Sequence, residues 1–352
     1  MFHFLLKKIL NSFLVLLGVV GIVFVLFFVL LPADSARLTM GQRSDAKTIA
    51  NIRKELYLDQ PIHKQFLLYL NDLSPLAIHG NAQEEREKYQ YVKLFSVGAE
   101  KNLVVKPPYL RRSFQTKKEV NAMLIDAFPG TLILASLSIL VASFFGILLG
   151  IIAALKQNTW LDSSAIFTSV LGISAPSFFA GILIAYLFGF LLKDYTGLSI
   201  ISPMWEYDPF TGRHLVLKSL ILPVVTLSIR PLAIITQITR SSMLDVMNQD
   251  FIRTAFAKGL SKRAVVWKHA LRNALNPVIT SISGWFAELL AGSFFIEYIF
   301  GWKGIGKITV DALNKFDFPV VMGAVLFTAL IFIIINILVD ILYTIIDPRI
   351  KR

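Results

Sequence analysis

The sequence predicts an all-α membrane protein with six transmembrane helices and a long loop between the first and the second. Composition is the first observation: of 352 residues, 55% are apolar and 16% are charged, with a mean hydropathy of +0.64, whereas about a quarter of a soluble domain is charged. The second observation is that the apolar residues form long blocks, and the third is that basic residues gather in short connections between blocks. The absence of cysteine excludes disulfides, zinc–thiolate sites and thiol catalysis.

The first apolar block, residues 9–31, is 23 residues long and holds no charged side chain. A helix needs roughly 20 apolar residues to cross the hydrocarbon core, so this block is long enough to span it. Lys7 and Lys8 precede the block, and a cleaved signal peptide is therefore the alternative. Because the apolar core of a signal peptide is only about 7–15 residues long, we expect a retained membrane anchor.

Five further blocks complete the count of six. The second span is expected at 129–155, where Pro129 suits the first turn of a helix because its missing N–H needs no partner there. The third, 163–192, is interrupted by Pro176. The last three spans are expected at 219–238, 277–299 and 320–346.

The basic residues orient these spans. The connection 239–276 holds seven basic and two acidic residues, whereas the connection 193–218 holds three of each. Short cytoplasmic loops of membrane proteins carry the excess of Lys and Arg, so 239–276 and both chain termini are placed in the cytoplasm. The net charge of +12 then reflects this asymmetry rather than the binding of nucleic acid.

Three segments follow from the spans: an N-terminal helix at 1–31, an extracytoplasmic loop or small domain at 32–128, and a five-helix core at 129–352. In the long loop, apolar residues at helical spacing predict amphipathic helices over 45–73. The apolar face of the second such helix comprises Ile62, Phe66, Leu67 and Leu70. The part at 80–115 contains a charged run and two consecutive prolines, Pro107 and Pro108, and is expected to be irregular.

The stretch Gly-Trp-Lys-Gly-Ile-Gly-Lys at 301–307 nearly spells a phosphate-binding loop. Ile308 stands where such a loop needs a hydroxyl group for magnesium, and no strand precedes the stretch. In the predicted topology it also lies outside the cytoplasm, so we interpret it as a tight turn. The five histidines show no metal-ligand spacing, and neither a metal site nor a catalytic residue is predicted.

The cytoplasmic connection predicts a helical hairpin. Residues 251–258 are compatible with a helix, Gly259 stands where that helix would end, and Ser261 can cap a second helix over 262–274. Apolar residues of the second arm are expected to form one stripe, with basic residues beside it. The stripe comprises Leu260, Ala264, Trp267, Leu271 and Leu275. Such a hairpin suits docking to a partner protein or lying on anionic lipid headgroups, and its composition leaves both open.

Several motifs together look like one family of transport proteins. In the hairpin they are Arg253-Thr254-Ala255-x3-Gly259 and the run from Lys268 to Pro277. Elsewhere they are Ser174-x-Pro176-Ser177-Phe178, Thr239-Arg240-Ser241-Ser242-Met243, Glu297-x2-Phe300-x-Trp302-x-Gly304-x-Gly306, Asn336-x3-Asp340-x2-Tyr343 and Asp347-Pro348-Arg349. The chain resembles the permease subunits of binding-protein-dependent ABC importers, in particular the dipeptide/oligopeptide (and nickel) family, over nearly its whole length except about 80–115.

The resemblance implies a type I ABC importer permease fold, an inner-membrane location and no enzymatic activity of this chain. A second homologous permease, cytoplasmic ABC ATPase subunits that use ATP and Mg, and an extracytoplasmic substrate-binding protein are the implied partners. Dipeptides or oligopeptides are the implied substrate, although relatives also carry peptide antibiotics or nickel chelates. The hairpin resembles the coupling helix that contacts the ATPase, and the residues to which this role would fall are Arg253, Thr254, Ala255, Lys258, Gly259, Leu260, Ser261 and Trp267.

Two charged residues, Arg230 and Glu288, fall near the middle of the fourth and fifth predicted spans. A lone charge at that depth costs roughly 2.5–3.5 kcal/mol, so we expect the two side chains to form an ion pair. The pair is either structural or lies beside the transport pathway. Ionisable groups at this depth also keep an ion-coupled secondary transporter open as the alternative function, with a non-transporting membrane scaffold as a third hypothesis.

The second predicted span carries a stripe of small residues at every fourth position. A stripe of this kind lets two helix backbones approach each other closely in a membrane. We therefore expect it to pack against a neighbouring helix. The stripe comprises Ala142, Gly146, Gly150 and Ala154.

Overall fold

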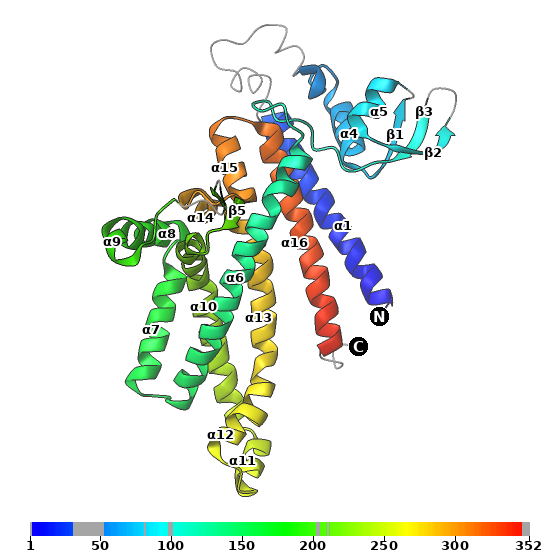
Figure 1. Cartoon of the computed structure of the whole chain (residues 1–352). Helices are drawn as coiled ribbons and strands as arrows, with labels where there is room; N and C mark the ends of the chain where they lie inside the picture. The colour runs from blue at the N-terminus through cyan, green and yellow to red at the C-terminus, as the bar shows by residue number, and fades with distance from the viewer. Residues whose placement is uncertain are drawn as a thin grey trace. The chain divides into compact units, whose positions relative to one another are not determined.

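A computed structural model describes residues 2–30, 53–80, 82–97, 101–201, 205–208, 210 and 212–346 of the chain (Figure 1). The chain forms two compact units. The first comprises Met1–Asp126 and Asp311–Leu330, and the second comprises Ala127–Val310 and Ile331–Arg352. Two long helices, α6 (Val120–Leu155) and α16 (Phe318–Ile346), contribute to both units.

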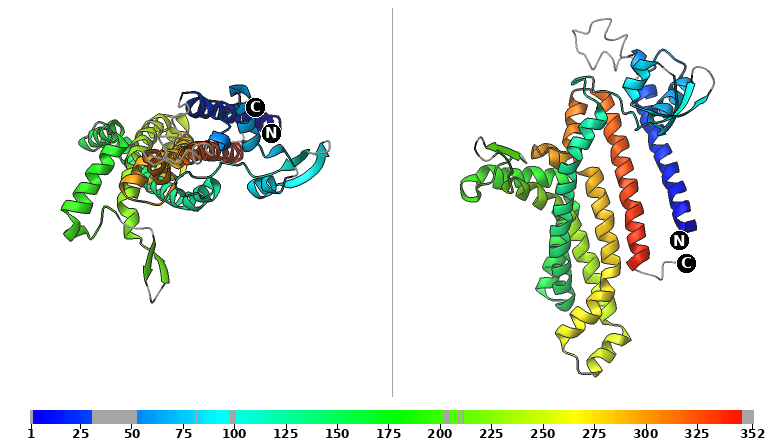
Figure 2. Two further views of the ribbon diagram at one scale, coloured as in Figure 1. Left: turned by 90° about the horizontal axis from the view of Figure 1, so that it is seen from above. Right: turned by 45° about the vertical axis from the view of Figure 1, so that its right-hand side comes forward.

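The first unit contains the N-terminal helix and a small α/β fold. Helix α1 (Phe2–Phe24) continues into a π-helical segment, η1 (Val25–Leu30). The small fold consists of α4 (Ile62–Leu73), β1 (Leu76–Gly80), α5 (Gln83–Tyr89), β2 (Val92–Val97) and β3 (Lys101–Val105). Figure 2 shows the same elements from two further sides.

The sheet of the first unit corrects the expectation that 80–115 is irregular. Its strand order is β1-β3-β2 with antiparallel pairing, and Ile78 lies opposite Leu103 in the register. Strand β3 alternates buried and exposed side chains, with Asn102 and Val104 directed inward, as a strand with one covered face must. The strands have only five or six residues each, and a charged helix separates β1 from β2, so periodicity alone did not reveal them.

Helix α4 confirms the helix predicted within 45–73, but its inner face differs from the prediction. Ile62 and Leu67 are exposed, whereas Gln65, Tyr69 and Asp72 are buried. Phe66 and Leu70 pack against the apolar core of this unit as predicted. The buried polar residues were missed because part of the inner face of α4 contacts a hydrogen-bonded cluster around Asp72 rather than apolar side chains. The first part of that prediction, 45–52, lies outside the described residues.

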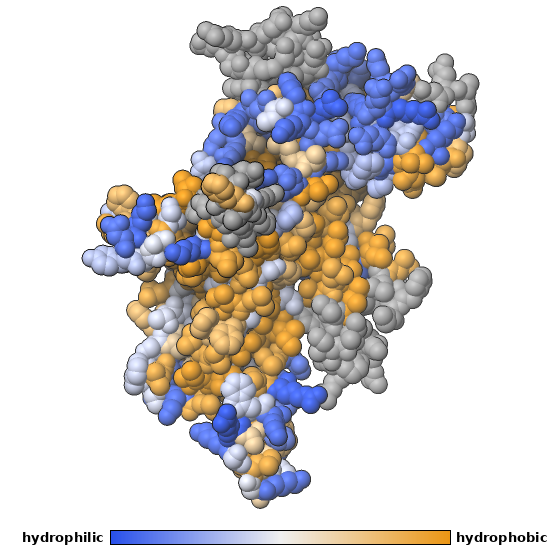
Figure 3. Space-filling view, viewed as in Figure 1, coloured by the Kyte–Doolittle hydropathy of each residue, from blue (hydrophilic) through white to orange (hydrophobic). Residues whose placement is uncertain are grey.

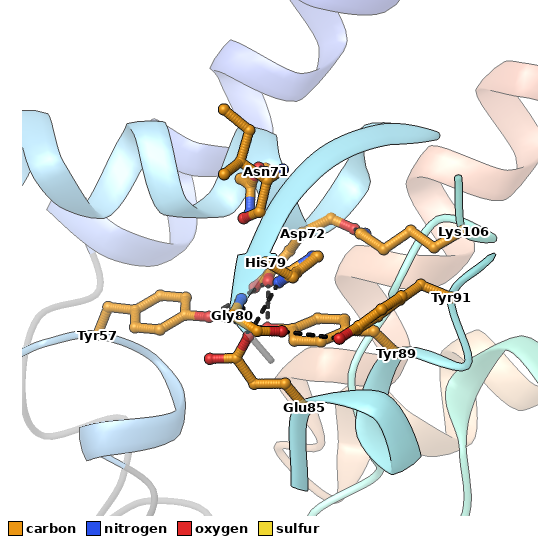
Figure 4. Close-up of polar contacts among 10 residues, drawn as sticks. Tyr57, Asn71, Asp72, His79, Gly80, Glu85, Tyr89, Tyr91 and Lys106 are labelled. Carbon is orange, nitrogen blue, oxygen red and sulfur yellow. Dashed lines mark hydrogen bonds and ion pairs between the residues drawn. The ribbon is translucent and has the colours of Figure 1, made fainter. Parts of the chain in front are cut away.

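Asp72 is the polar centre of the first unit (Figure 4). Its side chain is 2% exposed, and its Oδ1 accepts hydrogen bonds from the Tyr89 hydroxyl at 2.8 Å and the Tyr57 hydroxyl at 3.2 Å. The Lys106 ammonium donates to the main-chain carbonyl of Asp72. Arg111 lies 3.6 Å from Asp72 Oδ2, and its guanidinium also faces the ring of Phe28 at 5.3 Å. The Asp72 cluster thus ties α4, α5 and the segment after β3 to the end of the N-terminal helix.

His79 on β1 lies at the edge of this cluster (Figure 4). Its ring stacks on Tyr89 with 4.0 Å between centroids, and its Nδ1 lies 3.7 Å from Glu85 Oε2. Burial, and then the positive charge of Lys106, lower the pKa of His79. Burial lowers the pKa of Lys106 to about 8. Two basic groups are therefore held in an environment that disfavours their charge.

The described residues of the second unit are helical apart from one short hairpin of strands, β4 (Trp205–Asp208) and β5 (Gly212–Leu215). Helix α10 (Lys218–Met247) contacts α7 (Trp160–Ser174), α8 (Ser177–Tyr186) and α13 (Leu271–Gly292). The short elements of the unit are η3 (Leu187–Leu191), α9 (Lys193–Thr196), α14 (Phe294–Ile299) and the first part of α15 (Ile305–Asn314), whose end belongs to the first unit.

Four described helices are long and apolar enough to cross a membrane: Leu6–Leu30, Val120–Leu155, Lys218–Met247 and Phe318–Ile341. A fifth is counted if α7 and the helix after it form one span, although the two are bent by 104° at Pro176, where a single interrupted span was expected. The predicted fifth span, 277–299, falls on α13 and α14, which do not meet the same criterion. Six spans therefore stay a prediction.

Helix α6 begins at Val120 rather than at Pro129, which lies inside it. Proline is tolerated within membrane helices because neighbouring groups satisfy the backbone that it leaves unpaired, so it was a poor marker of the start. On the face drawn in Figure 3, hydrophobic residues cover the middle of the second unit, and hydrophilic residues gather at its lower end.

Glu297 organises the turn that resembled a phosphate loop. This buried carboxylate accepts hydrogen bonds from the Thr131 hydroxyl at 2.7 Å and the Ser293 hydroxyl at 2.6 Å. It also accepts from the backbone N–H groups of Gly306 at 2.7 Å and Lys307 at 3.2 Å. The first N–H groups of a helix lack partners within the helix, and here an internal carboxylate takes the place that phosphate occupies in a nucleotide-binding loop.

Candidate functional site

The hairpin predicted in the cytoplasmic connection is formed by α11 (Asp250–Ala257) and the arm that follows Gly259. Gly259 has φ +81°, in the left-handed region, and a Cβ placed there would meet no described atom within 4 Å. The Leu260 N–H donates to Ala255 O at 3.3 Å and the Gly259 N–H donates to Phe256 O at 2.9 Å. These two bonds make a Schellman motif, so backbone conformation rather than lack of space requires glycine here.

The second arm begins where the sequence predicted. The Ser261 hydroxyl accepts a hydrogen bond from the Ala264 N–H at 3.3 Å and caps α12 (Lys262–Ala264). A π-helical segment, η4 (Val265–Ala270), then leads into α13. The predicted apolar stripe is wrong at two positions, because Leu260 is 39% exposed and Trp267 is 50% exposed. Trp267 lies in η4, where a π-helical turn contains more residues than an α-helical turn and shifts the phase of the buried face, whereas Leu260 lies in the turn before the second arm.

The inner face of the hairpin packs on the ends of two long helices. Ile252 and Ala255 of α11 and Val265 of η4 are buried in one apolar cluster with Met243 of α10 and Ile151 of α6. This cluster fixes the hairpin to the two long helices. A force applied to the hairpin would therefore reach α6 and α10 through packed side chains.

The outer face of the hairpin combines exposed apolar and basic side chains. Its apolar members are Phe251, Phe256, Leu260 and Trp267. Its exposed basic members include Arg253, Lys258, Lys262, Arg263 and Lys268. A cavity of about 400 Å³ lies beside Trp267 and is lined by Ser261, Arg263, Ala264, Trp267 and Lys268. Of the residues assigned to the site, only Ala255 is buried, whereas Thr254 is exposed and donates its hydroxyl to Asp250 O at 2.9 Å.

An ion pair that the sequence analysis missed lies next to this site. Arg240 of α10 donates from Nε to Asp162 Oδ1 at 2.5 Å and from a terminal nitrogen to Asp162 Oδ2 at 2.8 Å. The Asn158 N–H also donates to the same carboxylate at 3.0 Å. Two-point pairing of this kind is geometrically specific, and here it joins the start of α7 to α10. Arg240 lies in the motif Thr239-Arg240-Ser241-Ser242-Met243, but its partner Asp162 is 78 positions away. A pair so distant in sequence leaves no periodic signal.

The stripe of small residues on α6 faces α10 within the second unit. A Cβ on Gly146 would lie 2.9 Å from Ile235 Cγ2, and one on Gly150 would lie 2.5 Å from Thr239 Cβ. Ala142 and Ala154 are buried. The two backbones are therefore too close for a larger residue at either glycine.

Arg230 and Glu288 do not form an ion pair in the described part of the chain. The Arg230 guanidinium instead lies over the Trp285 ring, 5.5 Å from its centroid. Trp285 and Glu288 are three residues apart on α13, so they share one face of that helix. Both charged side chains are exposed in the single subunit, and whether they meet in another state of the transporter stays a prediction.

Comparison with known proteins agrees with the resemblance. Residues 146–352 match the family described as binding-protein-dependent transport system inner membrane component, and residues 1–135 match the N-terminal family of the same membrane component. The chain is 35% identical over 338 residues to the di/tripeptide transport system permease protein DppB of Pseudomonas aeruginosa (strain UCBPP-PA14), which covers 92% of this chain and 91% of that protein.

A second relative is the glutathione transport system permease protein GsiC of Salmonella paratyphi A. It is 35% identical over 352 residues, which are 100% of this chain and 99% of that protein. Among solved structures, an inward facing MetNI methionine ABC transporter matches 62% of this chain and 96% of that chain, with 14% identity and a TM-score of 0.46.

In this family the permease is a non-enzymatic membrane component and a separate ATPase hydrolyses ATP. The relatives give no support to an ion-coupled secondary transporter. The two family models match residues 1–135 and 146–352, and the two curated relatives align with 92% and 100% of the chain. The chain therefore belongs to the binding-protein-dependent transport system inner membrane components, and it is the permease subunit of an ABC importer.

Proposed function

We propose that this permease imports short peptides and that its cytoplasmic hairpin transmits the ATPase cycle to the membrane helices. The outer face of the hairpin carries the proposal, because exposed phenylalanine, tryptophan and leucine side chains ringed by lysine and arginine suit a protein cleft. The peptide class is supported by the relatives, one named for di- and tripeptides and another for glutathione, itself a tripeptide.

In the proposed assembly, a second permease pairs with this chain and each rests on a cytoplasmic ATPase subunit. ATP and Mg are bound by those ATPases, and this chain binds no cofactor. An extracytoplasmic binding protein delivers the peptide, and both termini of the permease face the cytoplasm. Nucleotide binding is linked to the pathway because the hairpin is packed on α6 and α10, and a two-state element biased from two sites is what coupling requires.

Gly259→Val tests the coupling role. A residue with a Cβ in the left-handed region costs roughly 1–2 kcal/mol, and a β-branched side chain suits that region least, so the variant should distort the hairpin. In proteoliposomes holding the complete importer and its binding protein, we expect uptake of labelled di- and tripeptides to fall severalfold. The amount of membrane-inserted permease should not change.

Gly259→Asn is the matched variant, because asparagine tolerates this backbone conformation. It should retain most of the uptake. Normal uptake by Gly259→Val would refute the coupling role. If the unaltered importer drives ATP-dependent uptake of another solute but takes up neither di- nor tripeptides, the substrate class is wrong while the coupling role survives.

A further inference from the structure

An apolar pocket of about 260 Å³ lies in the first unit, among α1, the start of α6 and α16. Leucine, valine, isoleucine, phenylalanine and proline side chains form almost all of its wall. The lining comprises Leu16, Val20, Leu73, Pro107, Pro108, Leu110, Asn121, Ile125, Leu326, Phe327 and Leu330. The amide of Asn121 is the polar group of this lining, and it donates to the Pro108 carbonyl at 2.6 Å.

The pocket follows helices that are candidate membrane spans. Its lining on α16 extends to Leu330, 12 residues after the helix start at Phe318. At 1.5 Å per residue this depth is about 18 Å, and the hydrocarbon core is about 30 Å thick. The α16 residues that line the pocket, Leu326 to Leu330, therefore lie about 12–18 Å from the helix start, close to the middle of the bilayer. In the proposed orientation a hydrocarbon chain that fills the pocket enters from the extracytoplasmic leaflet, because α16 starts on that side.

The walls exclude several occupants. Water needs two to four polar partners in a buried site, whereas the side chains of this lining offer one acceptor, Asn121 Oδ1, because the Asn121 Nδ2 already donates to the Pro108 carbonyl. A further helix, about 10–12 Å across with its side chains, is too wide for this volume. An empty pocket would forfeit the dispersion contacts of its lining. A flexible hydrocarbon chain satisfies all three conditions.

We propose that this pocket binds one acyl chain of a phospholipid from the extracytoplasmic leaflet. The acyl chain fills the space between Val20 of α1 and Leu326 of α16, both of which are buried in the core of this unit. Lys117 and Lys118, both exposed, stand just before α6. They supply positive charge at the end of α6 nearest Asn121. This charge favours an anionic phospholipid over a zwitterionic one.

The test uses the complete importer in nanodiscs that contain a phospholipid with a photoreactive group at the end of one acyl chain. After irradiation, mass spectrometry maps the labelled peptides. We expect labelling of the peptides that contain Leu16, Val20 and Leu326 in the unaltered importer. Leu330→Trp places an indole in the pocket and should reduce this labelling severalfold. Leu330 is 38% exposed, so the larger side chain does not have to enter a closed core.

Ile334→Trp is the matched control, because Ile334 lies one turn further along α16, is 42% exposed and does not line the pocket. It should leave the labelling of those peptides unchanged. Ile125→Trp fills the pocket from α6 and replaces Leu330→Trp if that variant does not assemble. Equal labelling in all variants would show that lipid contacts the surface of these helices without occupying the pocket, and this result would overturn the proposal. Labelling confined to the second permease, with none in the peptides that line this pocket, would also overturn the proposal.

Discussion

Glu297 illustrates how far the residues alone could be interpreted. The glycines and lysines at 301–307 were interpreted as a turn rather than a nucleotide site. The reason was that Ile308 stands where a phosphate-binding loop has the Ser or Thr hydroxyl that binds magnesium. What the sequence could not show is that Glu297 itself receives the N–H groups of Gly306 and Lys307. The local pattern identified the turn, but a contact with Thr131, 166 positions away, completes it.

Asp72 and Asp162 were missed for a related reason. Each is nearly inaccessible, with side chains 2% and 4% exposed, yet acidic residues in predicted loops are normally assigned to the surface. Their partners, Tyr89 and Arg240, are distant in sequence. A buried carboxylate is tolerated only where it is paired or hydrogen-bonded, and that condition is visible only in three dimensions.

The environment of His79 predicts a pH dependence of the first unit. Its pKa in the folded state is below the ordinary value, whereas the unfolded chain titrates near 6.5. As pH falls below about 6.5, the unfolded state gains a proton that the folded state resists, so stability decreases with acidification. Above that range His79 is neutral in both states, and it does not make the free energy of unfolding depend on pH.

Hydrogen exchange of the β1 and β3 amides in the full-length permease, at pH 5.5 and pH 7.5, checks this expectation. His79→Phe keeps a ring against Tyr89 but removes the titration, so it should lose less protection in acid than the unaltered chain. His63→Gln changes an exposed histidine and should behave like the unaltered chain. An identical loss of protection in all three proteins would rule out His79 as the cause.

At the scale of elements, length decided what the sequence could predict. The long helices α1, α6, α10 and α16 were recognised because apolar blocks of this size have few other structures available. The short strands of the first unit and the π-helical segment Val265–Ala270 were not recognised. Both depend on pairing or packing with other parts of the chain, which overrides a weak local preference. An interruption at Pro176 was expected, but the sequence did not predict that the bend would be as large as 104°.

The contact between α6 and α10 gives a prediction at this scale. Gly146→Leu would drive a side chain into Ile235 and the Leu232 carbonyl, both within 3.0 Å of the position of the new Cβ. Overpacking of this kind typically costs about 1–3 kcal/mol, and here it would separate the two helices that hold the hairpin. We expect a lower yield of assembled importer in detergent and a lower thermal midpoint.

Gly18→Leu is the matched control for that change. Gly18 also lies in a membrane helix, but a Cβ there meets no described atom within 4 Å. It should leave the yield and the thermal midpoint of the complex unchanged. If Gly146→Leu behaves in the same way as the control, the two helices are not held together at this stripe in the assembled importer.

At the scale of the whole permease, one set of contacts within the second unit leads from the hairpin into the membrane. The apolar cluster beneath the hairpin reaches α10, and Arg240 of α10 is locked to Asp162 at the start of α7. The local sequence pattern predicted the hairpin and the family resemblance implied its role, but neither predicted this connection. Since α10 also packs on α13, a displacement of the hairpin would move the helices that carry Arg230 and Glu288.

Arg230 and Glu288 are charged side chains in the two helices that the hairpin would move, and their role in the transport pathway of the assembled importer can be tested. Both side chains are exposed in the single subunit, and Arg230 rests on Trp285, one turn from Glu288. If the two charges form a structural pair in the assembly, Arg230→Glu combined with Glu288→Arg should restore the uptake that either single change removes. If the guanidinium lines the pathway and meets a passing peptide carboxylate, uptake should be lost in all three proteins while assembly persists.

The exposed positions and the cation–π contact favour the pathway role, so we expect loss of uptake in all three proteins. Peptide uptake and complex yield are measured together, because only a drop in uptake at constant yield supports a role in the pathway. Arg230→Gln and Glu288→Gln test whether the charges matter at all. Normal assembly and transport by both would refute the structural pair and the pathway role alike, because a charge kept at membrane depth for either purpose cannot be neutralised without effect.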